Sequence, residues 1–150
     1  MADADARQDI LDAIAEAIDE LAFAIASLGE AYELLDEQTA DRLEAELFRP
    51  VQSAYGLAQR THVEFAARHG LPGAEFPART APAATHGPRA PIDAAVEAVR
   101  QADDRLSELQ DSFLPIEYGD QGLRTQLSDT RVLLGDVVRY ARELVRTLGR

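Results

Sequence analysis

Apolar residues recur at alternating steps of three and four through four stretches of the chain. One run comprises Ile14, Ile18, Leu21, Ile25, Leu28, Tyr32 and Leu35. Another comprises Leu123, Leu127, Thr130, Leu134, Val137, Ala141, Leu144 and Leu148. This spacing places a narrow apolar stripe along one side of a helix, the pattern by which long helices pack against one another. The sequence therefore predicts an all-α fold, a four-helix bundle.

Polar and turn-forming residues between these stretches set the helix limits. We expect one domain, 1–150, with helices at about 4–36, 40–69, 91–114 and 121–148. Thr39 is the expected N-cap of the second helix, and Pro115 should end the third. Pro50 lies inside the second helix, where a proline removes a backbone hydrogen bond. Because the apolar stripe continues on both sides, we predict a kinked continuous helix; the alternative is a restart with Pro50 in the first turn.

The linker 70–90 differs in composition from the rest of the chain. Residues 71–91 contain five of the seven prolines, which excludes regular structure there. The linker is either a strap packed over the bundle, anchored by Phe76, or a mobile connection. Fully extended, it spans ~70 Å at ~3.3 Å per residue, longer than any of the helices. A crossover connection is therefore possible, but we expect the simpler up-down-up-down winding, with the linker joining two helical hairpins.

Composition excludes several classes of function. The chain has no cysteine, which rules out disulfides and thiolate chemistry. Its net charge of −12 opposes binding to nucleic acid or to an anionic membrane surface. We see no secretion signal and no membrane-spanning run, so we expect a cytoplasmic protein. All fifteen basic residues are arginine, and with 27 alanines this is typical of a GC-rich bacterial genome.

Two histidines are the strongest candidates for a ligand site. His62 and His69 lie on one seven-residue line with Tyr55, on one face of the second helix. Sequential winding would bring His62 level with Glu16 on the first helix and Glu97 on the third. Histidines and carboxylates that converge between helices form the metal sites of bundles. The typical Glu-x-x-His spacing is missing, however, so the alternative is that both histidines pack at the edge of the core. We assign no metal ligands and no cofactor.

Arginines follow one side of the fourth helix. Arg139, Arg142 and Arg146 are spaced by three and four, so they share a face and form a candidate anion-binding site. The alternative is that they pair with acidic residues such as Glu143.

The first helix carries a second apolar band outside its main stripe. Phe23, Ala26 and Leu34 form this band, which we interpret as a surface for a homodimer or for a partner helix. Burial beneath the linker, through Phe76, is the alternative.

No arrangement of residues specifies a reaction. The chain has no glycine-rich phosphate loop and no serine in a nucleophile-elbow context. We expect a non-enzymatic interaction or structural protein that self-associates, with no nucleic-acid or membrane partner. The alternative is a bundle that binds a metal or small ligand through His62 and neighbouring carboxylates, either as a binding protein or as an enzyme.

Overall fold

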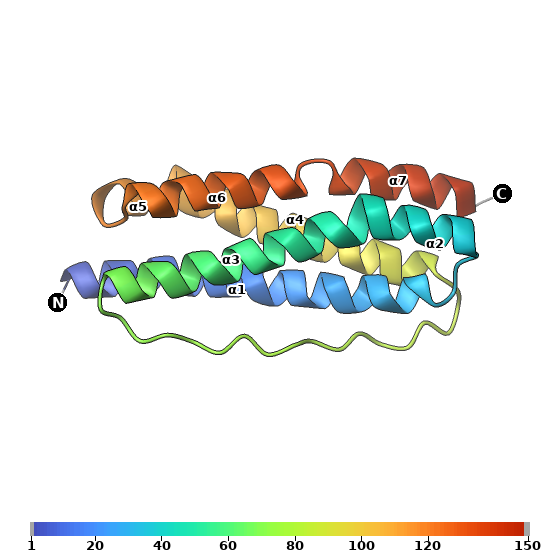
Figure 1. Ribbon diagram of the computed structural model, residues 1–150, viewed down its shortest axis with the longest axis horizontal. Coiled ribbons are helices and arrows are strands. Elements are labelled where there is room, and N and C mark those ends of the chain that lie inside the picture. Colours follow the sequence, from blue (N-terminus) through green and yellow to red (C-terminus); the bar gives the residue numbers. More distant parts are fainter. Residues whose placement is uncertain (1, 149–150) are drawn as a thin grey trace.

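Four long helical segments surround an apolar core in the computed structural model, which describes residues 2–148 (Figure 1). The elements are α1 (Ala2–Tyr32), α2 (Glu37–Leu43), the π-helix η1 (Glu44–Phe48), α3 (Arg49–Arg68), α4 (Arg89–Asp111), α5 (Leu114–Glu117), α6 (Gln121–Leu134) and α7 (Val137–Leu148). The second long segment is α2, η1 and α3 together, and the fourth is α6 and α7. The all-α four-helix bundle predicted from the sequence is confirmed.

The predicted apolar stripes form the core. Ile14, Leu21, Val51 and Leu123 are all completely buried. α1 contributes eleven buried residues between Ile10 and Ala31, and all of them except Ser27 are apolar. Alanines at many of the other buried positions allow the helices to approach closely. No helix within the described part of the chain is both long enough and apolar enough to cross a bilayer.

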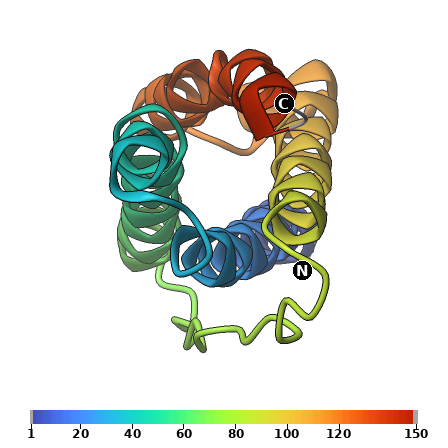
Figure 2. The same ribbon diagram turned by 90° about the vertical axis from the view of Figure 1, so that its right-hand side faces the viewer.

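The winding of the bundle is up-down-down-up, so the predicted up-down-up-down order is wrong. Figure 1 shows α3 and α4 running in the same direction. The linker that connects the end of α3 to the start of α4 passes along the length of the bundle. Seen end-on in Figure 2, α1 lies between α3 and α4, opposite α6 and α7. α1 and α4 pack against each other as an antiparallel pair, with Arg105 of α4 3.4 Å from Glu16 of α1. Near the start of α1, Arg7 donates to the backbone oxygen of Tyr118, which follows α5. The linker is long enough for this crossover, whereas sequence patterns do not record which helices are neighbours.

Residues 70–88, called the strap from here on, pack against the outside of the bundle beside α1 (Figure 2). Phe76 meets the ring of His62 edge-on, with 4.9 Å between the ring centroids. Further along, Arg79 forms an ion pair of 2.6 Å with Asp19 and lies 5.0 Å from the ring centroid of Phe23. Of the two alternatives for this segment, a packed strap or a mobile connection, these contacts agree with the packed strap anchored by Phe76.

The ends of the first three helical segments differ from the predicted limits. The first helix ends at Tyr32, not at residue 36, and the second starts at Glu37. Asp36, not Thr39, is its N-cap, because the Asp36 carboxylate accepts the backbone N–H of Thr39 at 2.8 Å. The third helix ends at Asp111, and residue 114 belongs to the short α5 instead.

Pro50 is accommodated without a break in the second helix. The π-helical turn Glu44–Phe48 precedes it, and the N–H of Arg49 donates to the carbonyl of Glu44, five residues earlier. A wider turn relieves the crowding that proline causes against the preceding turn of an α-helix. The continuous helix is as predicted, whereas the π-turn was not foreseen.

The fourth helix is interrupted, which the sequence analysis did not predict. α6 ends at Leu134, and Gly135 and Asp136 form a turn before α7 begins at Val137 (Figure 1). The apolar spacing continues across the turn, with Leu134 and Val137 both buried. Periodicity alone therefore could not reveal the interruption, although Gly135, a poor helix former, stands there.

Candidate functional site

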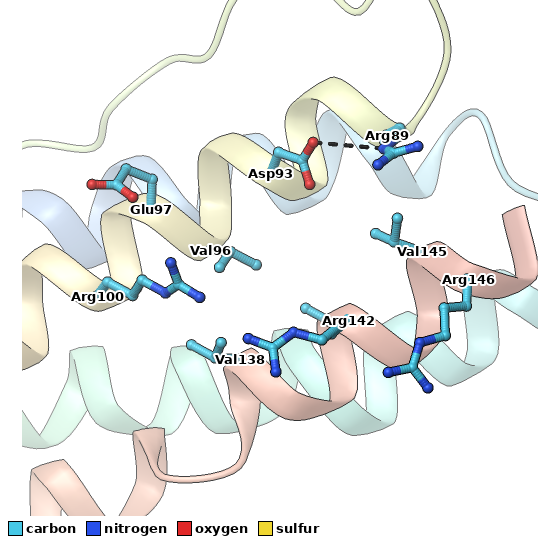
Figure 3. A pocket seen from close by; sticks show the side chains of 10 residues that line it. Arg89, Asp93, Val96, Glu97, Arg100, Val138, Arg142, Val145 and Arg146 are labelled. Carbon is cyan, nitrogen blue, oxygen red and sulfur yellow. Dashed lines mark ion pairs between the residues drawn. The ribbon is translucent and has the colours of Figure 1, made fainter. Parts of the chain in front are cut away.

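A groove with a volume of about 550 Å³ lies between α4 and α7. Ten residues line it: Arg89, Asp93, Val96, Glu97, Arg100, Val138, Ala141, Arg142, Val145 and Arg146. Figure 3 shows Val96 of α4 and Val138 and Val145 of α7 turned toward the space between the two helices, with Arg100 and Arg142 beside them. Four arginines against two carboxylates leave the groove cationic on a chain whose net charge is −12.

The arginines of the groove differ in their internal partners. Arg89 lies 3.8 Å from Asp93, one turn further along α4. Arg100, Arg142 and Arg146 form no ion pair or side-chain hydrogen bond with any residue within 2–148. A guanidinium presents five N–H donors in a planar fork suited to carboxylate and phosphate oxygens. These three groups are therefore free to contact an anion from outside the chain.

The floor of the groove is apolar. Val96 of α4 and Val138 and Val145 of α7 are half-buried, and Ala141 between them is buried. These short side chains leave space between two helices that pack far less extensively on each other than α4 packs on α1. The groove thus combines an apolar strip with cationic rims, features that suit an amphipathic partner rather than a lone ion.

The spacing of arginines on the fourth helix predicted one side of this groove. Arg142 and Arg146 line it as members of the predicted anion site, whereas Arg139 does not. Arg139 lies 3.0 Å from Asp136 and 3.7 Å from Glu143, and its guanidinium stacks on Tyr140. The hydrogen bond and charge of Asp136 raise the pKa of Arg139.

The α4 side of the groove was missed. Arg89 and Arg100 are eleven residues apart, three helical turns, so they share a face of α4. That spacing is visible in the sequence. Only the packing of α4 beside α7 places the face opposite Arg142.

The predicted ligand residues around His62 do not converge. His62 is 3% exposed and faces Phe76 of the strap, and its Nδ1 has no hydrogen-bond partner within residues 2–148. Burial lowers the pKa of His62, and the charge of Asp12 on α1 opposes this effect. Glu16 pairs with Arg105 instead, and Glu97 accepts a hydrogen bond from Gln101 at 3.3 Å.

His69 and Tyr55 also lie apart from a shared site. Tyr55 is half-buried against the apolar core. His69 contacts Asp120 at 2.9 Å, at the far end of the bundle from the groove. Among residues 2–148, no three His, Asp or Glu side chains are placed to hold a metal ion.

Asp120 joins the second and fourth helical segments. Its carboxylate accepts the backbone N–H of Leu123 at 2.8 Å as the N-cap of α6, and receives two hydrogen bonds of 2.8 Å from Arg68. Burial alone would raise the pKa of Asp120. The hydrogen bonds from Arg68, the Leu123 backbone and His69 outweigh burial and hold the pKa well below its usual value. The cluster is satisfied internally, which is typical of a structural joint.

The predicted self-association band on α1 is partly covered. Phe23 is half-buried beneath Arg79 of the strap, and Ala26 is half-buried as well. Leu34, in the turn after α1, is 46% exposed. Phe23 is thus covered by the strap, as in the alternative prediction, but the residue that covers its ring is Arg79 and not Phe76.

Comparisons with models of known protein families, with curated proteins and with solved structures find no match to this chain. The candidate site is therefore described by its geometry: three arginines with no ion-pair partner among residues 2–148, around a valine-floored groove between α4 and α7.

Proposed function

We propose that this protein is a non-enzymatic interaction module that binds an acidic amphipathic segment of a partner protein in the α4–α7 groove. The observation that carries the proposal is the absence of an internal partner, within residues 2–148, for Arg100, Arg142 and Arg146 around an apolar floor. A cytoplasmic location and a helical protein partner, both expected from the sequence, belong to this proposal.

The shape of the groove supports a helical occupant. α7 is twelve residues long, about 18 Å at ~1.5 Å per residue, and the lining residues extend along most of it. An amphipathic helix places apolar residues at steps of three and four into such a groove. The valines of both helices provide the contact strip, and the arginines on the rims face the flanks of the bound helix.

Charge selects the kind of partner. Flanking glutamates or aspartates would meet three free guanidinium groups, and exposed pairs of this kind contribute about 1 kcal/mol each. A nucleic acid is disfavoured because the rest of the molecule is strongly acidic: residues 1–37 alone carry eleven acids and one arginine. A lone phosphate would leave the apolar floor unused.

A designed peptide tests the proposal directly. The probe has about 14 residues, ~21 Å when helical, with leucines along one face and glutamates on both flanks. Its affinity is measured by fluorescence anisotropy, and a peptide with lysines in place of the glutamates serves as the charge control. We expect saturable binding of the acidic peptide only, weakening as salt screens the ion pairs.

Arginine variants locate the binding site. Arg142→Gln and Arg146→Gln should each weaken binding about five-fold, as expected for ~1 kcal/mol. The matched control is Arg139→Gln, on the same helix but outside the groove and paired with Asp136. Equal effects of all three substitutions, or no saturable binding at all, would refute the proposal. Competition by inorganic phosphate with the same arginine dependence would show a simple anion site instead.

Self-association stays a separate prediction. The only member of its predicted surface that is exposed is Leu34, because Phe23 and Ala26 are half-buried. Light scattering of the Leu34→Glu variant beside the unmodified chain tests it: a dimer that is lost in the variant supports the prediction, and a strict monomer in both contradicts it.

A further inference from the structure

A second hollow, independent of the α4–α7 groove, lies beneath the strap and contains a buried hydroxyl group without a partner. Ser27 of α1 is 1% exposed, and its Oγ forms no hydrogen bond with any residue within 2–148. A buried polar group that lacks a partner costs free energy, so native proteins rarely leave one unused. Ser27 therefore requires a structural or functional explanation.

The buried hydroxyl groups of Thr61 and Thr130 each form a hydrogen bond of a kind that Ser27 lacks. Thr61 donates to the carbonyl of Leu57 at 2.7 Å, and Thr130 donates to the carbonyl of Gln126 at 2.8 Å. Both bonds reach four residues back along the helix, the usual solution for a buried helical hydroxyl. Ser27 occupies the same kind of position on α1 without that bond, so its donor and acceptor capacity remains available.

Ser27 is one of the residues that line a pocket of about 260 Å³ between α1, the strap and the start of α4. Seven of its ten lining residues are alanine or proline, among them Ala84 of the strap and Ala94 of α4. The remaining three are Ser27, Thr85 and His86, and both Thr85 and His86 are exposed. Among the side chains that line the pocket, the walls are therefore mostly apolar and Ser27 is the buried polar one.

We infer that this pocket binds a small, uncharged, apolar molecule that carries one hydrogen-bonding group directed at the Ser27 hydroxyl. The volume exceeds the ~150 Å³ of an apolar cavity that accommodates benzene, so a single-ring compound fits. No carboxylate or guanidinium lines the pocket to neutralise a charged ligand, which excludes strongly ionic compounds. The strap forms one wall, so an occupant would contact the strap and the bundle together.

Phenol and benzene are a matched pair of probes, since they differ only in the hydroxyl group. Binding is followed by the NMR chemical shifts of the alanine methyl groups around the pocket. We expect phenol to bind between about 2-fold and 10-fold more tightly than benzene, the contribution of one hydrogen bond. Ser27→Ala should abolish that preference while benzene still binds.

Two further variants keep the test decisive. Ala94→Leu fills the pocket from α4 and should prevent binding of both compounds, whereas Ser53→Ala, an exposed serine on α3, should change neither. The inference is overturned if phenol causes no saturable shifts of these methyl groups, or if Ser27→Ala leaves the preference for phenol intact. Because the pocket shares no residue with the α4–α7 groove, either outcome leaves the peptide experiment unaffected.

Discussion

Asp120 should contribute more to stability than an ordinary helix cap, and the chain contains the control needed to show it. Asp120→Ala removes the N-cap of α6, worth about 1 kcal/mol. It also removes the paired hydrogen bonds from Arg68 and the contact with His69. The side chains of Arg68 and Asp120 are 37% and 27% exposed, so solvent limits this second contribution to about 1 kcal/mol. The expected total loss is about 2 kcal/mol.

Asp36→Ala is the matched control. Asp36 caps α2 through the N–H and hydroxyl of Thr39 and makes no ion pair within residues 2–148. Its replacement should remove only the cap, about 1 kcal/mol. Asp120→Asn keeps an oxygen for the cap and removes the charge, so it should fall between the unmodified chain and Asp120→Ala.

Urea unfolding followed by circular dichroism at neutral pH measures these differences. A double-mutant cycle with Arg68→Gln then isolates the cross-bundle pair. If Asp120→Ala destabilises the fold no more than Asp36→Ala does, the contact between α3 and α6 through Asp120 is not stabilising, which contradicts the prediction.

The pH dependence of the free energy of unfolding gives a second test. Because the pKa of Asp120 is lowered in the folded state, its contribution is complete above about pH 3.9 and is lost as the pH falls through the folded-state pKa.

Three further predictions concern the turn after α5, the strap and the winding. Gly119→Ala should cost about 1–3 kcal/mol in urea unfolding, because the added Cβ would overlap the carbonyl oxygen of Pro115. The lowered pKa of His62 means that the unfolded chain takes up its proton first. Stability should therefore fall as the pH drops below about 6.5. In His62→Leu the thermal melting temperature should depend less on pH across that range. The same pH dependence in the variant and in the unmodified chain would contradict the burial argument. Glu16→Cys with Arg105→Cys, in a chain free of other cysteines, should be joined within one molecule by a short thiol cross-linker; sequential winding would place the pair on diagonal helices and prevent it.

The sequence predicted what depends on local periodicity. Buried residues such as Leu21 and Leu127 follow directly from the apolar spacing, and the continuity through Pro50 follows from the same stripe. The π-turn before Pro50 and the interruption at Gly135 were missed because both leave that spacing intact. The apolar pattern is the same whether or not the backbone hydrogen bonds shift locally.

Features that depend on which helices are neighbours were beyond the sequence. The linker length allowed either winding, so the crossover and the position of α4 beside α1 could not be chosen in advance. That choice separates Glu97 from His62. The third and fourth helices are neighbours in either winding, but the sequence does not show which face of α4 turns toward α7 and brings Arg100 opposite Arg142. Half of the candidate groove was accordingly predicted from the spacing on the fourth helix, and the other half required the fold.

An NMR titration can locate the proposed binding of an acidic amphipathic segment in the α4–α7 groove. The ¹⁵N-labelled protein is titrated with the acidic peptide while backbone amide shifts are recorded. We expect saturable shifts centred on Val96, Arg100, Ala141 and Val145, which are absent with the lysine peptide. Shifts centred on the strap or on the outer face of α1, or none that saturate, would contradict it.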